Sequence, residues 1–334
     1  MNILSVYGIS DDNQIVVLIN EGFAGGLHPN FKGVNTITQL LNKDIFNVSE
    51  VILGGVQENL NVKLPKIDAI YCSICNYDNQ RNSIDSFEQK FSTTDIPIIN
   101  HPSGIKKSTR DTIYDAFKTS SEFIVPKTVR VRPKSVKNVF ELAREHSFEF
   151  PFIFRTIAEN NAKNMVKIYS IEDTDKLESF AFDGREFYMI QYHEYVSNDG
   201  LYRKYRALMI DGELVLRHLL FSDEWKNANF DGHEKVVGRM SQMVAKEEES
   251  FLRTAPEAKL IEMSKALYEF LGLDFFGFDF AFDKEGNIIL FEANSCMMAY
   301  YSLDYGPKYL QEDALKIKKK LETMFINKIK KEKK

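Results

Sequence analysis

The chain has 334 residues, 44% of them hydrophobic and 27% charged, and its formal net charge is −5 at pH 7. This length is enough for two or three packed domains, and the composition is that of a soluble globular protein. The negative charge argues against nucleic acid as a partner. The lack of an apolar run of ~20 residues and of a signal-peptide pattern argues against a membrane and favours the cytoplasm.

Residues 1–105 alternate strand-like with helix-like segments. We expect strands over residues 3–7, 15–19, 51–53, 69–73 and 96–99, and helical segments over residues 36–41 and 86–91. Strands that alternate with helices are typical of an open α/β sheet. The sequence therefore predicts a small α/β domain at the N-terminus.

Two arginines stand out in the next part of the chain. Arg110 lies in a helix predicted over residues 108–117, and Arg155 ends an apolar strand. Between them a helix is expected to begin at Ser135, a plausible N-cap. A return strand over residues 165–169 and a helix over residues 171–182 should follow. Taken singly, each arginine is most simply a surface charge.

A strong turn signal, Asp211-Gly212, follows a strand-like run that begins near residue 202. Counting outward from a two-residue turn puts Arg206 opposite Arg217, with Lys204 on the same face. Two arginines opposite each other repel unless an anion lies between them. The hairpin is therefore either a phosphate site or a solvated basic face, and its apolar neighbours favour the phosphate site.

A second hairpin is predicted over residues 275–294, where two apolar runs flank a polar turn. If the turn is residues 284–287, Asp279 lies opposite Glu292, and Asn294 points the same way. Opposed carboxylates need a neutralising partner, and Mg²⁺ prefers such oxygen ligands. The alternative is a hairpin whose polar side chains meet solvent, which the nearly continuous apolar runs disfavour.

The chain should end in a helix from about residue 310, followed by a lysine-rich tail over residues 326–334 that we expect to be frayed and solvated.

Together these features are the parts needed to bind a nucleoside triphosphate, with cations for its phosphates and carboxylates for Mg²⁺. The sequence contains neither GxxxxGK[ST] nor GxGxxG. The phosphates would then be held by side chains from sheets and not by a glycine-rich loop.

Residues 97–297 resemble the ATP-grasp superfamily of carboxylate–amine ligases. The most specific match is Asp279 followed by Glu292-Ala293-Asn294, which corresponds to the superfamily's metal triad. Asn100-His101-Pro102 and Val125-Pro126-Lys127-Thr128 resemble the entry to its first subdomain. Arg203-Lys204-Tyr205-Arg206 and Trp225-Lys226 look like a branch related to glutathione-synthetase-like and ribosomal-protein glutamylase-like ligases.

The resemblance implies a role for each candidate residue. Arg110 and Arg155 would bind ATP phosphates, Gln191 and Tyr192 would form the adenine hinge, Asp199 would lie near the ribose, Lys204, Arg206 and Arg217 would stabilise charge during catalysis, and Asp279, Glu292 and Asn294 would hold Mg²⁺, as two ions. His218, next to Arg217, should point to the opposite face and is not a candidate base. The loop over residues 158–164 departs from the pattern because it contains no glycine, although Lys163 could supply charge there.

The implied fold combines α/β and α+β parts. It would consist of a small N-terminal open α/β domain at residues 1–105, a first ATP-grasp subdomain at residues 106–186, a second subdomain with the metal site at residues 187–325, and the basic tail at residues 326–334.

The implied function is an ADP-forming ligase. It would activate a substrate carboxylate as an acyl phosphate and join it to an amine, on an amino acid or a peptide. Its partners would be ATP and these two substrates, and a homodimer is an open possibility. The alternatives are a non-catalytic ATP- and Mg²⁺-binding module, a ligase that forms ester or amide crosslinks in a precursor peptide, and a phosphotransferase on the same scaffold.

Overall fold

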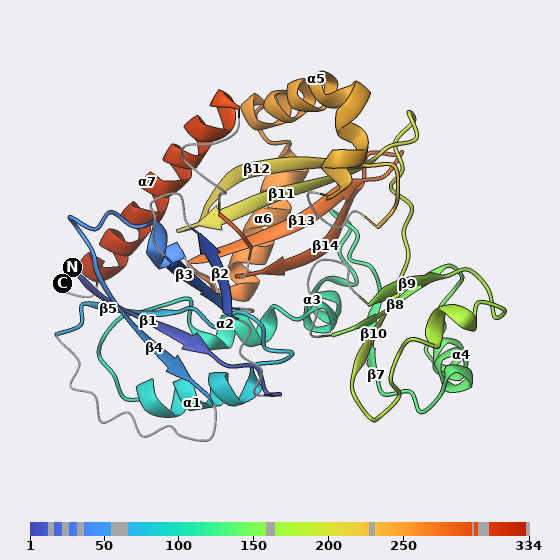
Figure 1. Cartoon of the computed structure of the whole chain (residues 1–334), viewed down its shortest axis with the longest axis horizontal. Helices are drawn as coiled ribbons and strands as arrows, with labels where there is room; N and C mark the ends of the chain where they lie inside the picture. The colour runs from blue at the N-terminus through green and yellow to red at the C-terminus, as the bar shows by residue number, and fades with distance from the viewer. Residues whose placement is uncertain are drawn as a thin grey trace.

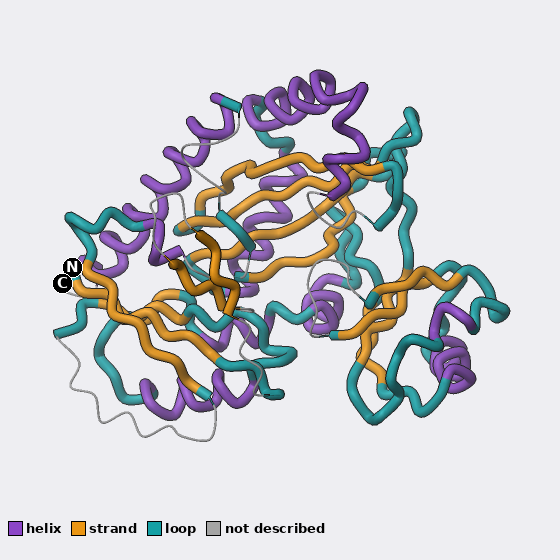
Figure 2. The backbone as a smooth tube through the Cα atoms, viewed as in Figure 1, coloured by secondary structure: helices purple, strands orange, loops and turns teal. Residues whose placement is uncertain are grey.

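The computed structural model describes residues 1–12, 17–21, 27–31, 37–54, 66–157, 164–226, 231–295, 297–299 and 307–331. Within these residues, three four-stranded sheets and one two-stranded hairpin form (Figures 1 and 2). No helix among them is long and apolar enough to cross a bilayer.

The N-terminal sheet is parallel and has the strand order β4-β1-β5-β6. Its strands are β1 (Asn2–Gly8), β4 (Asn47–Leu53), β5 (Ala69–Cys72) and β6 (Ile98–Ile99). Helix α1 (Arg81–Phe91) packs through Ile84 and Phe87 on one face. Helix α7 (Lys308–Lys331) packs through Leu321 and Phe325 on the other (Figure 1). A parallel sheet needs both faces covered, and here the second cover comes from the far end of the chain.

Other short elements accompany this sheet. They are the antiparallel hairpin of β2 (Val17–Glu21) and β3 (Leu27–Phe31), and a 3₁₀ turn, η1 (Ile37–Leu40).

The middle sheet is antiparallel in the order β7-β10-β8-β9 and forms a separate lobe with α4 (Figure 1). Its elements are β7 (Thr128–Val131), α4 (Val136–Glu145), β8 (Phe152–Thr156), β9 (Met165–Ile168), η2 (Asp175–Leu177) and β10 (Phe187–Gln191). Ser135 caps α4, as predicted, because its hydroxyl accepts a hydrogen bond from the Asn138 amide at 3.2 Å. The helix predicted over residues 171–182 is wrong. Only η2 is helical there. Leu177, at its end, and Phe180, in the turn after it, reach the core.

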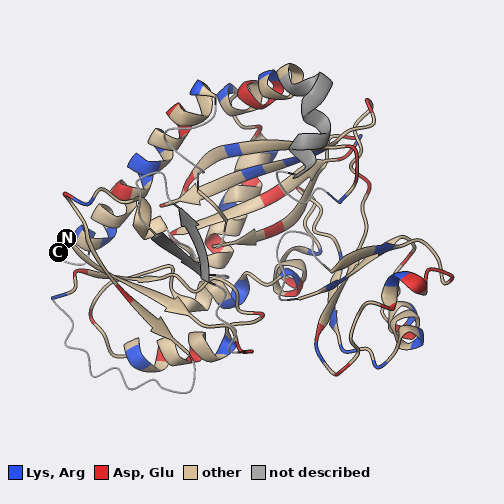
Figure 3. Cartoon of the chain, in the orientation of Figure 1, with Lys and Arg blue, Asp and Glu red and all other residues tan. Residues whose placement is uncertain are grey.

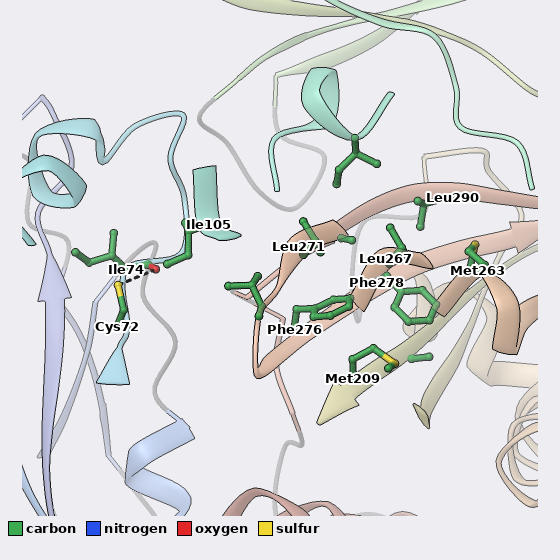
Figure 4. Close-up of a cluster of buried hydrophobic side chains, with 14 of the residues drawn as sticks. Cys72, Ile74, Ile105, Met209, Met263, Leu267, Leu271, Phe276, Phe278 and Leu290 are labelled. Atoms are coloured by element: carbon green, nitrogen blue, oxygen red, sulfur yellow. Dashed lines mark hydrogen bonds between the residues drawn. The ribbon is translucent and has the colours of Figure 1, made fainter. Parts of the chain in front are cut away.

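The third sheet is antiparallel in the order β12-β11-β13-β14. Its strands are β11 (Tyr202–Ile210), β12 (Glu213–Ser222), β13 (Phe275–Phe282) and β14 (Ile288–Asn294), and its helices are α5 (Asp231–Arg253) and α6 (Ala258–Leu271). Phe276 and Phe278 of β13 pack against Leu267 of α6 (Figure 4). The same buried cluster includes Cys72 and Ile105, so it joins this sheet to the N-terminal domain.

Helix α7 runs through most of the region predicted to be a frayed tail. Ile329 is buried, and Lys328 binds Asp274 with Nζ 3.0 Å from the carboxylate. The predicted tail is therefore wrong for residues 326–331, because one face of the lysine-rich segment is apolar and packs on the sheet. Residues 332–334 lie outside the described part of the chain.

The short helix α2 (Pro102–Lys107) and the residue Asn100 before it contact the start of β13 and the end of α6. Asn100, with a positive φ of 57°, donates to the Phe275 carbonyl at 2.7 Å and accepts from the Phe275 amide at 2.8 Å. Gly104 approaches the α6 backbone so closely that a Cβ atom there would lie 2.4 Å from the Leu271 carbonyl oxygen.

Replacement of Gly104 by alanine should lower the free energy of unfolding by about 1–3 kcal/mol, because backbone atoms cannot move aside as a flexible side chain can. Urea unfolding checks this, with Ser103→Ala, an exposed position on the same helix, as the control. Equal stabilities for the two variants would show that α6 shifts freely.

Candidate active site

The hairpin β13–β14 brings Asp279 opposite Glu292, which confirms the predicted pairing. The turn length and the strand register that produce this pairing both differ from those expected. The turn has five residues, since Phe282 pairs with Ile288, so the predicted four-residue turn is wrong. That turn alone would place Asp279 and Glu292 on different faces. A β-bulge restores the register, because Phe280 pairs with Leu290 whereas Asp279 pairs with Glu292.

The turn itself is stabilised by Asp283. Its Oδ1 accepts hydrogen bonds from the amides of Glu285 at 3.0 Å and Asn287 at 2.7 Å. This carboxylate therefore supports the loop conformation, on which the position of the bulge depends.

The hairpin β11–β12 contains a second bulge, and here the predicted pairing is wrong. The turn at Asp211-Gly212 is as expected, with φ of 50° and 81° at its two residues. Beyond Ala207, however, the register shifts, and Arg206 pairs with His218 instead of Arg217. The extra residue in β12 moves Arg217 out of the pairing and puts His218 opposite Arg206, on the face from which it was expected to be absent.

Asp279 is buried at 1% exposure and is held by two cations of the neighbouring strand. Arg206 donates to both carboxylate oxygens, with Nε 2.6 Å and the terminal nitrogen 2.9 Å away, and Lys204 Nζ lies 3.0 Å from Oδ2. Burial raises the pKa of Asp279, but Arg206 and Lys204 outweigh burial and hold that pKa well below its usual range. Basic residues of β11 thus lie beside acidic residues of β13 and β14 (Figure 3).

His218 borders this cluster as a neutral side chain. Burial, with repulsion from Arg206 and Arg217, lowers the pKa of His218 well below its usual range. An imidazole in this setting adds no further positive charge beside Asp279.

Glu292 is paired with Arg110 and also acts electrostatically on Arg155. Arg110, the first residue of α3 (Arg110–Phe117), forms an ion pair with the Glu292 carboxylate. Burial lowers the pKa of Arg110, but attraction to Glu292 outweighs it, so that pKa is raised. Arg155 on β8 is buried, and burial with repulsion from Arg110 lowers its pKa to about 9. The two arginines and Glu292 therefore act on one another electrostatically across a domain junction.

An open pocket adjoins these residues. It is lined by residues 75–78 of the N-terminal domain, residues 108–110 at the start of α3, and Ile157, Glu292 and Asn294. Nothing in the sequence pattern singled out residues 76–78 or Ser108 and Thr109, because they reach the pocket only through domain packing.

The two residues of the predicted adenine hinge, Gln191 and Tyr192, make different contacts. The Gln191 side chain accepts from the Glu149 amide at 3.0 Å and donates to the Glu149 and Pro151 carbonyls, so it fixes the loop beside β10. Tyr192 donates to Glu194 at 2.9 Å, and its ring centroid lies 3.8 Å from Lys167 Nζ.

Lys167 and Trp225 lie beside this predicted hinge, and Lys167 was not among the candidates from the sequence. Lys167 Nζ is also 5.0 Å from the Trp225 ring, and Trp225 meets Tyr192 edge to face at 6.0 Å. Lys226 donates to the Met165 carbonyl at 3.0 Å. The available signal was the position of Lys167 within a short apolar strand, where a buried cation is costly unless it has a partner.

Asp199, the candidate ribose ligand, lies in a tight contact with Arg203. Two hydrogen bonds, of 2.9 and 2.8 Å, join the guanidinium to the carboxylate, and they lower the pKa of Asp199 to about 2. This bidentate pair orients Asp199 along β11 and commits both carboxylate oxygens to Arg203.

The donor set fits a hard cation. Among the described residues no group of three or more His, Cys, Asp and Glu side chains could hold a metal, so the candidate ligands are two carboxylates and the amide oxygen of Asn294. Oxygen donors of this kind suit Mg²⁺, which takes few protein ligands and completes its shell with water and phosphate. The glycine-free loop, including Lys163, lies outside the described residues except for Asn164.

No protein-family model and no curated protein matches the sequence. Solved structures do match. D-alanine–D-alanine ligase from Bacillus anthracis is 13% identical, with a TM-score of 0.59 and coverage of 100% of this chain and 99% of that chain. The RimK domain protein ATP-grasp from Sphaerobacter thermophilus is 9% identical, with a TM-score of 0.54 and coverage of 96% and 99%.

A third match is the macrocyclase MdnC from Microcystis aeruginosa, bound with its precursor peptide MdnA. It is 10% identical, with a TM-score of 0.54 and coverage of 98% of this chain and 100% of that chain. The similarity extends over the whole length of each protein, and it includes the N-terminal domain as well as the two sheets that meet at Glu292. The chain therefore has the ATP-grasp fold, and the predicted fold class is confirmed.

Proposed function

We propose that the protein is an ATP-dependent, ADP-forming ligase that joins a substrate carboxylate to an amine. The observation that carries this proposal is the convergence of Asp279 and Glu292 with Arg110, Arg155 and Arg206, side chains that come from different parts of the fold. The cluster thus combines cations that could bind phosphate with carboxylates that could hold Mg²⁺.

This combination suits a nucleoside triphosphate with its metal ion. Arg110, Arg155, Lys204 and Arg206 would bind its phosphate oxygens, with Arg217 contributing charge from the adjacent bulge. Asp279, Glu292 and Asn294 would hold two Mg²⁺ ions. When bound, Mg²⁺ would neutralise charge on the phosphates. Each carboxylate is now paired with a cation, so the binding of the nucleotide and metal would exchange these partners without leaving a buried charge unpaired.

In the proposed reaction, a carboxylate oxygen of the substrate attacks the γ-phosphorus of ATP, and the bond to ADP breaks. An amine nitrogen then attacks the acyl carbon of the resulting acyl phosphate, and phosphate leaves with the bonding electrons while the amine proton passes to solvent. The chain's residues orient the reactants and stabilise charge, because none of these steps requires a covalent nucleophile.

The pocket beside Glu292 is the proposed substrate site. Its lining includes Asp78, which would bind an ammonium group, beside Arg110, which would bind the phosphates. An amino acid or a peptide end would supply that ammonium group. The precursor peptide bound to MdnC supports a variant in which this ligase forms crosslinks within a peptide. The cytoplasm is the proposed location.

The test is incubation with ATP, Mg²⁺ and a pool of amino acids and short peptides, followed by mass spectrometry. ADP together with a new amide or ester supports the ligase. ADP with a phosphorylated product would instead indicate a phosphotransferase, and nucleotide binding without turnover would indicate a non-catalytic module.

The single tryptophan provides a binding assay that does not need a substrate. Because Trp225 lies beside Tyr192 and Lys167, binding of a non-hydrolysable ATP analogue with Mg²⁺ should change its fluorescence in a saturable way. Arg155→Gln should weaken that binding by about 10–100-fold, since a charge-assisted hydrogen bond to a phosphate is lost.

The matched control is Arg185→Gln, an exposed arginine paired with Asp183. It should bind the analogue like the natural protein. Equal affinity of the Arg155 and Arg185 variants would contradict the assignment of Arg155 to the phosphates.

A further inference from the structure

A partly buried ionic network, which we call the junction network, lies at the meeting point of the N-terminal domain, α3 and the middle sheet. It consists of Asp78, Asp111, Arg130, Glu186 and Tyr188. Asp78 follows β5, Asp111 is the second residue of α3, Arg130 is on β7, and Tyr188 is on β10 with Glu186 just before it. None of these residues belongs to the proposed nucleotide ligands.

Arg130 is the centre of the network. Its Nε donates to Asp111 at 2.9 Å, and one terminal nitrogen donates to Asp78 at 2.7 Å, to Asp111 at 3.1 Å and to the Tyr188 hydroxyl at 2.7 Å. The other terminal nitrogen donates to Glu186 at 3.1 Å. The planar guanidinium therefore joins three segments that are far apart in sequence, with five N–H donors in a fixed plane where a lysine would offer three.

Tyr188 completes the network as a neutral donor. Its hydroxyl donates to Asp78, with a distance of 2.8 Å to Oδ2. Burial and the charges of Asp78 and Asp111 raise the pKa of Tyr188 above its usual range, so the phenol keeps its proton.

Three members of the network adjoin the proposed site directly. Asp78 lines the substrate pocket, Asp111 follows Arg110 in the chain, and Tyr188 is the register partner of Arg155. Movement of the network would therefore displace the pocket wall that contains Asp78, and with it Arg110 on α3 and Arg155 on β8.

We propose that Arg130 is a positioning residue, which sets the substrate pocket by holding Asp78 and the start of α3 against the strand that carries Arg155. This inference rests on the proposed ligase function for its kinetic consequence, but the geometric part stands without it. Arg132 provides a matched control, because it also binds Glu186, at 2.9 Å, yet its side chain is 64% exposed.

The first measurement is hydrogen exchange of the full chain. In Arg130→Gln, amides of residues 76–78 and 110–113 should exchange at least about tenfold faster, while β1 and β5 keep their protection. Arg132→Gln should show no change. Unchanged exchange at residues 76–78 in Arg130→Gln, or an equal acceleration throughout the chain, would overturn the proposal.

The second measurement is steady-state kinetics with the substrates found in the pool assay. Arg130→Gln should raise the KM of the pocket substrate and reduce kcat/KM by about 10–100-fold, the usual range for loss of an orienting partner, while Arg132→Gln keeps natural values. Arg130→Lys should recover part of the loss. Natural kinetics in Arg130→Gln would overturn the positioning role.

Tyr188→Phe keeps the experiment decisive if Arg130→Gln does not fold. It removes the hydroxyl that binds both Asp78 and Asp111, and it should accelerate exchange at residues 76–78 and 110–113 less than Arg130→Gln does. If the natural protein shows neither nucleotide binding nor turnover, the proposed function fails, and the exchange data still decide whether Arg130 fixes the junction.

Discussion

Replacing Glu292 with glutamine should lower the rate of ADP formation by about 10²–10³-fold, because it removes a charge that would hold Mg²⁺ at the phosphates. Glutamine keeps the size of the side chain, so the hairpin β13–β14 should remain folded. The charge of Arg110 loses its partner at the same time. A coupled ADP assay over a range of Mg²⁺ concentrations measures the effect, and half-maximal activity should require more Mg²⁺ than in the natural protein.

The control is Glu285→Gln, in the exposed turn of the same hairpin, which should retain natural activity. Asp279→Asn should be as inactive as Glu292→Gln. Full turnover in both Asp279→Asn and Glu292→Gln would remove the basis for a metal site on this hairpin.

Replacing Arg206 with methionine should destabilise the protein by about 3–5 kcal/mol at pH 7, because it leaves the buried Asp279 with only one cation. Methionine fills a similar volume, so the loss is mainly electrostatic. Arg253→Met is the control, since Arg253 forms a partly exposed pair with Asp313 and should cost less than about 1 kcal/mol.

The pH dependence separates charge from packing in the Arg206 variant. The pKa of Asp279 is lower in the folded state than its usual value of ~3.9 in an unfolded chain. Its ion pairs therefore stabilise the fold above about pH 4, and this contribution is lost as the pH falls towards the folded-state pKa. The pKa of the neighbouring His218 is itself well below its usual range, because burial and the charge of Arg206 disfavour its protonated form.

The difference in unfolding free energy between the natural protein and Arg206→Met should consequently be largest at neutral pH and shrink below about pH 4. Denaturant unfolding at pH 7 and near pH 3 checks this. A difference of the same size at both values would show that Arg206 acts through packing instead of charge.

Local signals in the sequence predicted local structure well. Asp211-Gly212 predicted a two-residue turn because its residues tolerate positive φ, and Ser135 predicted the start of α4 because its hydroxyl can accept from a free amide. The helix expected over residues 171–182 does not form, because its apolar residues do not determine the local backbone in the way that turn and cap residues do. Leu177 and Phe180 reach the core of the middle sheet from a single 3₁₀ turn and the residues after it, so their burial does not require a long helix.

Bulges limited what the hairpin patterns could predict. A single extra residue reverses the face of every side chain beyond it, and neither bulge has a glycine or another residue that would mark it. At β13–β14 the bulge compensated for a wrong turn length and preserved the pairing of Asp279 with Glu292. At β11–β12 no such compensation occurred, and His218 took the place expected for Arg217.

The sequence by itself determined the two hairpins and the chemistry of the candidate ligands, because hydrophobic periodicity, turn residues and the spacing of Asp279, Glu292 and Asn294 are local properties. The ATP-grasp fold class was expected from the resemblance that these residues carry. Only the tertiary structure decided which cations meet which carboxylates. Arg110 and Glu292 are 182 residues apart, and Asp78 and Arg130 come from different units. Such pairs form where domains pack, and domain packing depends on the shape of whole surfaces, which no local pattern records.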